Sequence, residues 1–150
     1  MIKTFRGLLA DGGQDRIRLS TKKGKIGYKI VKLEIMPNEP AVDQHESTVK
    51  LFKVKQSVVD AKVDFSDGNL LAASLWNSGN AQGGQDAIWV PLSTIFEQEI
   101  FNQDVYITHS ETDGSNPINY YLELETMVMT DNQAAVSTLR DIRLNPQVGG

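Results

Sequence analysis

The chain has 150 residues, of which 40% are hydrophobic and 23% charged, so it is long enough for one well-packed core and has the composition of an ordinary globular domain. It contains no cysteine, which excludes disulfides, thiolate metal sites and cysteine nucleophiles. No apolar run approaches the ~18 residues of a membrane helix, and Met1–Arg6 lacks the apolar stretch of a signal peptide. We therefore expect a single domain over residues 1–143 with no membrane partner.

Charge is distributed unevenly along the chain. Residues 1–65 contain 13 basic and 8 acidic residues, whereas residues 66–150 contain 2 basic and 11 acidic ones, which gives net charges of +5 and −9 within a total of −4. The total argues against general binding to a phosphate backbone. Two interpretations of the asymmetry are open. Either a basic side of one copy docks on an acidic side of the next, or the two halves interleave and their charges mix on the surface.

Three segments in the first half predict strands. Arg16–Thr21 alternates polar and apolar residues, which is the period of a half-buried strand. In Lys25–Met36 and Ser47–Lys55 the apolar positions change phase, after Ile30 and after Leu51 respectively. A one-residue change of phase predicts a β-bulge or a strand buried on both faces.

Further strands are expected in the middle of the chain. Val58–Phe65 is the weaker candidate, and Leu70–Trp76 is a continuous apolar run whose length favours a buried strand, although its composition would also suit one or two helical turns. Asn77–Asp86 predicts a loop. Ala87–Ile95 contains Pro91 and therefore suits an edge strand, because proline cannot donate to an internal ladder.

The segments Glu99–His109 and Asn119–Met129 are rich in β-branched and aromatic residues, and the turn Thr112–Pro117 separates them. They predict a hairpin with a long tip. Alternation within the second arm divides it into two faces. The residues expected in the core are Tyr120, Leu122, Leu124 and Val128, and those on the opposite face are Tyr121, Glu123, Glu125, Met127 and Met129.

One helix is expected, from an N-cap at Asp131 to about Arg143. The apolar residues that recur at the spacing of one helix face are Ala135, Leu139 and Ile142. Residues 144–150 are expected to form a flexible tail or an arm exchanged between subunits. Eight strands and one short C-terminal helix predict a mostly β fold, namely a β-sandwich or single jelly-roll-like domain, with an up-and-down barrel still open.

The sequence lacks the usual signatures of catalysis and metal binding. His45 and His109 fall in a predicted polar loop and at a strand end, where we expect surface histidines rather than a three-ligand zinc site. No Gly-x-Ser-x-Gly elbow and no phosphate-binding loop occurs. We therefore expect no enzyme activity, no cofactor and no metal.

Two alternatives rest on carboxylates. Glu123 and Glu125 lie about 6–7 Å apart on one strand face, which overlaps the separations used in glycoside hydrolysis, but a solvated strand face is the commoner origin of such a pair. The segment Asp64–Asn69 offers several oxygens to calcium, but their order does not match the EF-hand loop, and a turn accounts for the same residues.

Basic and aromatic residues define the candidate binding positions. Lysines that alternate with apolar residues along a strand form a polar face and discourage edge-to-edge aggregation, so no specific nucleic-acid partner is expected. Trp89, beside Pro91, could stack on a carbohydrate, whereas Trp76 is expected in the core. The residues expected at subunit contacts are Lys22, Lys23, Lys25, Glu123, Glu125 and Trp89.

Several strings of this sequence resemble small uncharacterised proteins encoded by marine bacteriophages. The likeness spans most of the chain and is carried by residues 5–12, 14–17, 27–32, 101–109, 119–125 and 138–143. It implies a virion component, namely a capsid, decoration or minor capsid protein or a tail part, assembled in the host cytoplasm from copies of itself and other virion proteins. The alternative function is a carbohydrate- or receptor-binding module.

Overall fold

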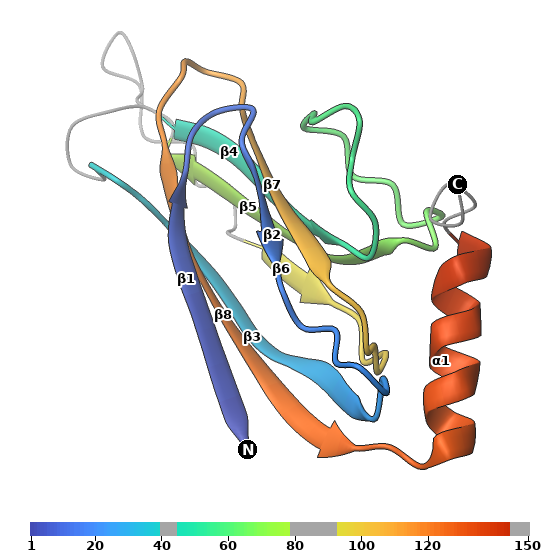
Figure 1. Ribbon diagram of the computed structural model, residues 1–150. Coiled ribbons are helices and arrows are strands. Elements are labelled where there is room, and N and C mark those ends of the chain that lie inside the picture. The colour runs from blue at the N-terminus through green and yellow to red at the C-terminus, as the bar shows by residue number, and fades with distance from the viewer. Residues whose placement is uncertain (40–44, 79–92, 145–150) are drawn as a thin grey trace, which may run out of the picture.

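The computed structural model describes residues 1–39, 45–78 and 93–144. Two antiparallel sheets pack face to face, and one helix follows the last strand (Figure 1). The three-stranded sheet has the order β1-β8-β3, with β1 (Ile2–Leu9), β8 (Ile118–Val128) and β3 (Ile26–Pro37). The five-stranded sheet has the order β2-β7-β4-β5-β6, with β2 (Gln14–Ile17), β7 (Val105–Glu111), β4 (His45–Phe52), β5 (Leu70–Ser78) and β6 (Ser93–Phe96). The predicted β-sandwich with a C-terminal helix is confirmed.

The strands pair in a nested order along the chain. β1 pairs with β8, β2 with β7, and β4 with β5, so the chain wraps on itself as one long folded hairpin. A fourth pair, β3 with β6, would complete a regular jelly roll. Instead β6 pairs with β5 and extends the five-stranded sheet. The topology is therefore jelly-roll-like, with its sixth strand moved to the other layer.

The core lies between the two sheets. Its most deeply buried side chains are aliphatic and come from both layers, because alternate residues of each strand point inward. The side chains that are at most 1% exposed include Ile30, Leu122 and Leu124 from one sheet and Val49, Leu51, Val105 and Ile107 from the other. The predicted core face of β8 is confirmed at Tyr120, Leu122 and Leu124, but Val128 is 82% exposed because it lies at the end of the strand, beyond the opposing sheet.

The predicted change of phase after Ile30 is a β-bulge in β3, whereas the one after Leu51 marks a strand that is buried on both faces, since Leu51 and Phe52 are 0% and 5% exposed. The register between β3 and β8 shifts between Ile30 and Lys32, and the register between β4 and β5 shifts between Leu51 and Phe52. β4 keeps its register with β7 there, and the extra residue in its pairing with β5 is Leu71 of β5. In β3 the extra residue is Val31, which turns outward and is 40% exposed. The bulge thus keeps Ile30 and Leu33 both in the core although they are three residues apart.

The predicted hairpin between residues 99 and 129 is wrong. β7 and β8 belong to different sheets, and residues 112–117 cross from one layer to the other. Both strands have an apolar face that must be buried, and they bury these faces against each other across the sandwich rather than side by side within one sheet.

The predicted strand Val58–Phe65 is also wrong. These residues belong to a long excursion between β4 and β5, which we call the strap (residues 53–69). The strap is held on the outer face of the five-stranded sheet, where Asp60 and the carbonyl of Lys62 accept hydrogen bonds from Lys50 Nζ at 2.9 and 2.5 Å. The strap buries Lys50, so a charged side chain on an outer face is only 6% exposed.

The predicted strand Arg16–Thr21 is displaced toward the N-terminus, since β2 ends at Ile17. The backbone N–H groups of Leu19 and Ser20 donate to Asp104 Oδ1 at 2.7 and 2.9 Å, and Tyr28 Oη donates to the carbonyl of Leu19 at 3.0 Å. The Asp104 carboxylate thus accepts the backbone hydrogen bonds of Leu19 and Ser20 that a neighbouring strand would otherwise accept.

The helix α1 (Asp131–Leu144) matches the predicted range. Its N-cap is Thr130 rather than Asp131, because Thr130 and Gln133 form a reciprocal capping box: Gln133 N–H donates to Thr130 Oγ1 at 3.2 Å and Thr130 N–H donates to Gln133 Oε1 at 3.0 Å. The predicted packed face is wrong at Ala135 and Leu139, which are exposed.

Among residues 131–139 of α1, whose side chains the structure describes, Ala134 and Ser137 are buried, and Asn102 Nδ2 donates to Thr138 Oγ1 at 3.0 Å. Polar anchoring has therefore decided which face of α1 turns inward. The side chain of Ile142, residues 145–150 of the predicted tail and residues 79–92 lie outside what the structure describes. Among the described residues, no helix has the length and apolar character that crossing a bilayer requires.

Candidate functional site

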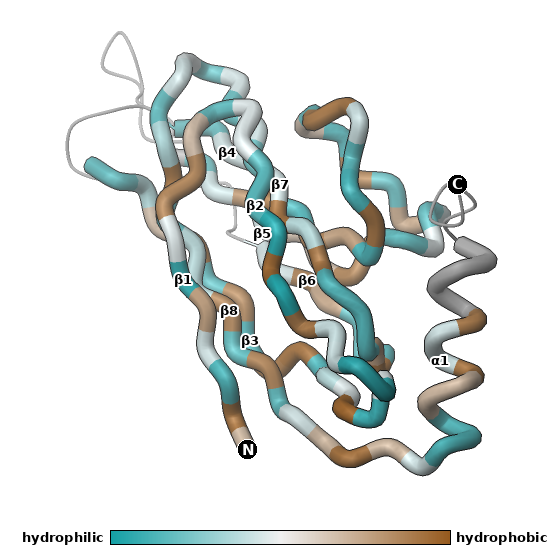
Figure 2. The backbone as a smooth tube through the Cα atoms, viewed as in Figure 1, coloured by the Kyte–Doolittle hydropathy of each residue, from teal (hydrophilic) through white to brown (hydrophobic). Residues whose placement is uncertain are grey.

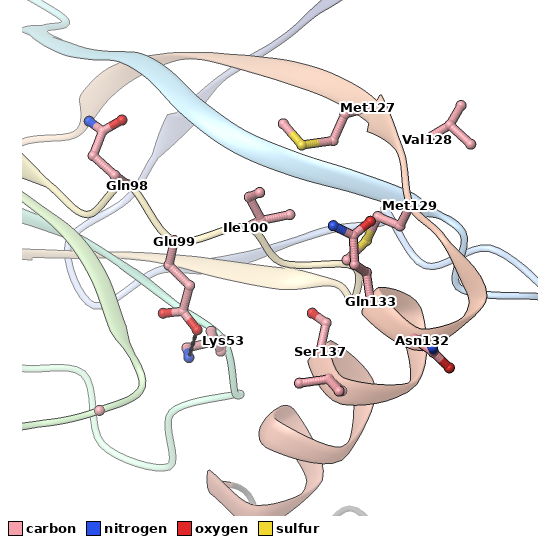
Figure 3. Close-up of a pocket in the computed structure, with 12 residues that line it drawn as sticks. Lys53, Gln98, Glu99, Ile100, Met127, Val128, Met129, Asn132, Gln133 and Ser137 are labelled. Carbon is pink, nitrogen blue, oxygen red and sulfur yellow. Dashed lines mark hydrogen bonds and ion pairs between the residues drawn. The ribbon is translucent and has the colours of Figure 1, made fainter.

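A groove of about 870 Å³ lies between α1, the end of β8 and the segment after β6. We call it the α1 groove. Figure 3 shows the pair Lys53–Glu99 on one side of it and α1, with Gln133 and Ser137, on the other. Its lining residues are Lys53, Gly68, Gln98, Glu99, Ile100, Met127, Val128, Met129, Asn132, Gln133, Val136 and Ser137.

The α1 groove is lined by apolar as well as polar side chains, and several of the apolar ones are exposed. Val128 and Val136 are 82% and 57% exposed, and Ile100 is 38% exposed. Met127 and Met129 add unbranched thioether side chains, which adapt to the shape of a partner surface. Gly27 lies directly behind them, because a Cβ there would come within 2.8 Å of Met129 Sδ. The missing side chain at Gly27 therefore lets Met129 pack against β3.

The charged part of the α1 groove is an ion pair whose lysine is buried. Lys53 Nζ donates to Glu99 Oε1 at 2.7 Å, and the lysine side chain is 3% exposed. The opposite charges compensate each other, so burial of the lysine is tolerated. The ion pair holds the segment that carries Glu99 against the end of β4. Because its two charges cancel, the pair adds no net charge to the groove.

The closest approach to a catalytic arrangement is the pair His109 and Ser47, whose Nε2 and Oγ lie 3.0 Å apart. His109 Nδ1 lies 3.1 Å from the carbonyl oxygen of Leu9 and 3.2 Å from that of Ala10, so Nδ1 carries the proton and Nε2 accepts from the serine. Both side chains are buried, which leaves no room for a substrate. The pair ties the end of β1 to β7 and β4.

Burial lowers the pKa of His109, and this effect outweighs the opposing one of the two carbonyls. The imidazole is therefore neutral at pH 7. The prediction of surface histidines is wrong for both, since His45 and His109 are 1% and 0% exposed. Each sits at an inward-facing position of its strand, where alternation places it opposite the other sheet.

The carboxylates of Glu123 and Glu125 lie on the outer face of the three-stranded sheet, as predicted. Glu123 Oε1 accepts from Tyr121 Oη at 2.8 Å, which raises the pKa of Tyr121. Glu125 lies 3.9 Å from Lys29 Nζ on the neighbouring strand. Each carboxylate thus has its own partner on an open strand face, and the two do not enclose a site for a sugar ring.

The lysines proposed for subunit contacts are not gathered with these glutamates. Lys22 and Lys23 are exposed in the turn between β2 and β3, and Lys25 Nζ lies 2.8 Å from Asp131 at the start of α1. Trp89 lies outside the described residues. Trp76 packs partly buried against the core, as expected, and its Nε1 is fully buried.

The segment Asp64–Asn69 forms turns. Asp64 Oδ1 accepts from Ser66 N–H and Oγ–H at 2.9 and 2.6 Å, which lowers the pKa of Asp64, and Asp67 Oδ1 accepts from Asn69 N–H at 2.9 Å. Within residues 1–39, 45–78 and 93–139, no three His, Asp or Glu side chains gather as a metal site would require.

The positive and negative halves of the chain interleave in the described structure. Acidic β8 lies between β1 and β3, which carry most of the basic residues of that sheet. Of the six ion pairs among the described side chains, four join a basic residue before position 66 to an acidic residue after it, and these are Arg16–Asp104, Lys25–Asp131, Lys29–Glu125 and Lys53–Glu99. Much of the opposite charge of the two halves is therefore compensated by ion pairs within the domain.

No protein-family model matches this chain, and a search of curated proteins found no match. The site that the structure adds, the α1 groove, was not predicted. Among the described side chains of α1, the one apolar residue that lines the groove is Val136, and periodicity alone assigns an apolar residue of a helix to the core.

Proposed function

We propose that this chain is a non-enzymatic structural subunit of a bacteriophage virion, which works through contacts with copies of itself and with other virion proteins. The observation that carries the proposal is the α1 groove with its exposed apolar side chains, of which Val128 and Val136 are more than half exposed. Soluble monomers rarely leave contiguous apolar surface open unless a partner covers it.

Two further observations support this proposal. Three of the four nested strand pairs of a jelly roll, the architecture that capsid proteins use, occur in this fold, although fold alone does not fix function. The sequence strings that resemble marine bacteriophage proteins extend over β1, β2, β3, β7, β8 and α1, which are elements of both layers and the helix. A shared architecture, rather than a shared catalytic site, is what these strings have in common.

Particles provide the direct test. We expect the purified protein to co-sediment with particles of a phage that encodes it and to occur there in a fixed copy number. Hundreds of copies would assign it to the shell or its decoration, and about a dozen to a ring or vertex. A protein that is absent from washed particles and fails to bind them would refute the proposal.

A pair of variants links this test to the α1 groove. Val136→Asp places a charge on the groove wall, whereas Ala135→Asp places the same charge on the next exposed position of α1, which does not line the groove. We expect Val136→Asp to weaken binding to particles at least tenfold and Ala135→Asp to leave it within about twofold. Equal effects of both would remove the groove from the contact surface.

A further inference from the structure

The strand β1 has an open edge. It pairs on one side with β8 over all eight of its residues without a register shift, and within the described part of the chain no strand pairs with its other side. Figure 2 shows a mixture of hydrophobic and hydrophilic residues along it. Long, regular edges of this kind are the sites at which sheets join.

The other three edges are less suited to pairing. β2 and β6 have four residues each. β3 has a register shift after Ile30, ends at Pro37, and is bridged at Tyr28, whose N–H and C=O bond to Phe101 at 2.8 and 3.0 Å. A bulge, a proline and a covering segment are the usual means by which an edge is protected from pairing. Among the described residues, β1 has no bulge, proline or covering segment, and the edge protection that it carries is the charge of Lys3 and Arg6.

The register identifies the backbone groups that point to the open side of β1. Thr126 N–H donates to Met1 O at 2.8 Å, and this pair continues the register that sets Ile2 against Glu125. Hydrogen-bonded and non-hydrogen-bonded pairs alternate along an antiparallel ladder, so the odd residues of β1 bond to β8. The residues whose N–H and C=O groups face outward are therefore Ile2, Thr4, Arg6 and Leu8.

We infer that β1 is the edge at which two copies of the chain join, antiparallel to each other about a twofold axis at Phe5. The two three-stranded sheets then form one continuous six-stranded sheet. This inference rests on the proposed function, since it names the surface through which copies associate.

The side chains of β1 fit this register. Ile2 lies opposite the second copy's Leu8, so two apolar side chains that are each about half exposed cover one another. Lys3 lies opposite Gly7, the one residue of β1 without a side chain. At the axis the two Phe5 rings meet as a non-hydrogen-bonded pair, the closer of the two pair types.

Charge disfavours two of the alternative registers. A shift of two residues in one direction sets Arg6 against Arg6, and a shift of four in the other sets Lys3 against Lys3; like charges directly opposite are unfavourable. In the inferred register Arg6 lies opposite Thr4 of the other copy, and Thr4 lies opposite Glu123 within its own sheet. Arg6 of one copy and Thr4 and Glu123 of the other thus lie in one line across three neighbouring strands. The opposite charges of Arg6 and Glu123 attract the two copies to each other.

Proline substitution tests the edge. Thr4→Pro removes an outward N–H but no hydrogen bond to β8, and proline is tolerated at such edge positions. Thr4→Val keeps the N–H and serves as the control. We expect wild type and Thr4→Val to form dimers in sedimentation equilibrium, and Thr4→Pro to raise the dissociation constant at least tenfold while its circular dichroism spectrum is retained.

Cross-linking tests the register independently, because the natural chain has no cysteine. Two Phe5→Cys chains would bring their Cα atoms to about 4.5 Å, within reach of a disulfide, whereas two Leu8→Cys chains would be about 20 Å apart. We expect oxidation to link Phe5→Cys and not Leu8→Cys. The double variant Thr4→Cys/Arg6→Cys, whose thiols lie on the outer face, should also link and covers the case in which loss of the Phe5 ring unfolds the domain.

A strictly monomeric wild type, a dimer that Thr4→Pro leaves intact, or equal cross-linking at positions 5 and 8 would each overturn the β1 contact. If a strand of another virion protein paired with this edge instead, Thr4→Pro would weaken binding to particles although the isolated chain formed no dimer. That result would also overturn the inferred contact between two copies. The proposed function is judged separately, by the presence of the protein in particles.

Discussion

At the scale of single residues, Asp104 organises the turn that leads from β2 toward β3. Its carboxylate accepts from Leu19 N–H, Ser20 N–H and Ser20 Oγ–H, and it is ion-paired with Arg16, whose Nε lies 2.7 Å from Oδ2. Burial opposes ionisation of this carboxyl, but the hydrogen bonds outweigh it and lower its pKa to about 2. The folded state therefore stabilises the charged form.

Asp104 should make stability depend on pH in the acid range. Because its pKa is about 2 when folded and 3.8 for an unperturbed aspartate, the unfolded chain binds the proton first, and stability present above pH ~4 is lost as the pH falls toward 2. The loss corresponds to about 2 kcal/mol. Urea unfolding of wild type and Asp104→Asn should show a difference that narrows between pH 5 and pH 2. A constant difference would mean that the carboxylate charge is not what stabilises the turn.

The buried pair His109 and Ser47 leads to a second prediction at this scale. Ser47→Ala should destabilise the fold by about 1–3 kcal/mol, because it leaves Nε2 of a buried imidazole without its donor. Chemical denaturation measures the loss, and Thr48→Ala, on the opposite face of the same strand, is the control. A Ser47→Ala variant as stable as the wild type would show that water or a rearranged ring replaces the hydroxyl.

At the scale of secondary-structure elements, α1 depends on its ends and on polar anchors rather than on an apolar face. Asn102 Nδ2 donates to the carbonyl of Gly24 at 2.9 Å as well as to Thr138, which connects α1 to the start of β3. Met129 N–H donates to the carbonyl of Lys25 at 2.7 Å just before the helix begins. The capping box of Thr130 and Gln133 then sets the first turn.

Removing the cap should loosen the helix selectively. Thr130→Ala should cost about 1 kcal/mol, whereas Thr130→Ser, which keeps the hydroxyl, should be nearly neutral. Hydrogen exchange is the suitable measurement, because the amides of the first helical turn should exchange faster in Thr130→Ala while those of β8 stay protected. If the exchange of α1 did not change, the anchors at Asn102 would be sufficient to hold the helix by themselves.

The secondary-structure elements also show how much of the fold could be predicted from the sequence. The bulge after Ile30 and the burial of β4 on both faces after Leu51 were predictable, because a one-residue change of apolar phase leaves only these two alternatives. The count of eight strands agrees with the structure only because two errors compensate: β1 was not predicted as a strand, and Val58–Phe65 was. β1 is an edge strand whose exposed pattern carries little apolar alternation, whereas the strap has alternating residues and no partner strand.

The site was harder to predict than the fold. Which strands pair is a property of the whole chain, so the separation of β7 and β8 into two layers, and with it the burial of His109, had no local signal. The α1 groove exists because Asn102 fixes the orientation of α1 by hydrogen bonds, and these join residues more than thirty positions apart. Only the outer-face position of Glu123 and Glu125 followed from alternation along one strand.

At the scale of the whole molecule, the two halves of the chain are interdependent. The strands of the first half, β1 to β4, do not pair with one another; they pair with β8, β7 and β5 of the second half. Only the short ladder of β5 with β6 lies within the second half. Neither half can therefore form its sheets alone, and the opposite net charges of the halves, +5 and −9, favour their association.

Splitting the chain tests this interdependence. A break between Phe65 and Ser66 falls in the strap, outside every strand, and separates the two charge blocks. Each fragment alone should be largely unfolded by circular dichroism, and mixing them should restore the β spectrum and the protection of core amides. Because exposed charges are screened over about 8–10 Å at 0.1–0.15 M salt, association should slow as ionic strength rises. If residues 66–150 folded alone, the nested pairing would not be what holds the sandwich together. If the rate at which the fragments associate did not depend on salt, the opposite charges of the two halves would not drive their association. Contacts between copies would then be the remaining role for the charge asymmetry.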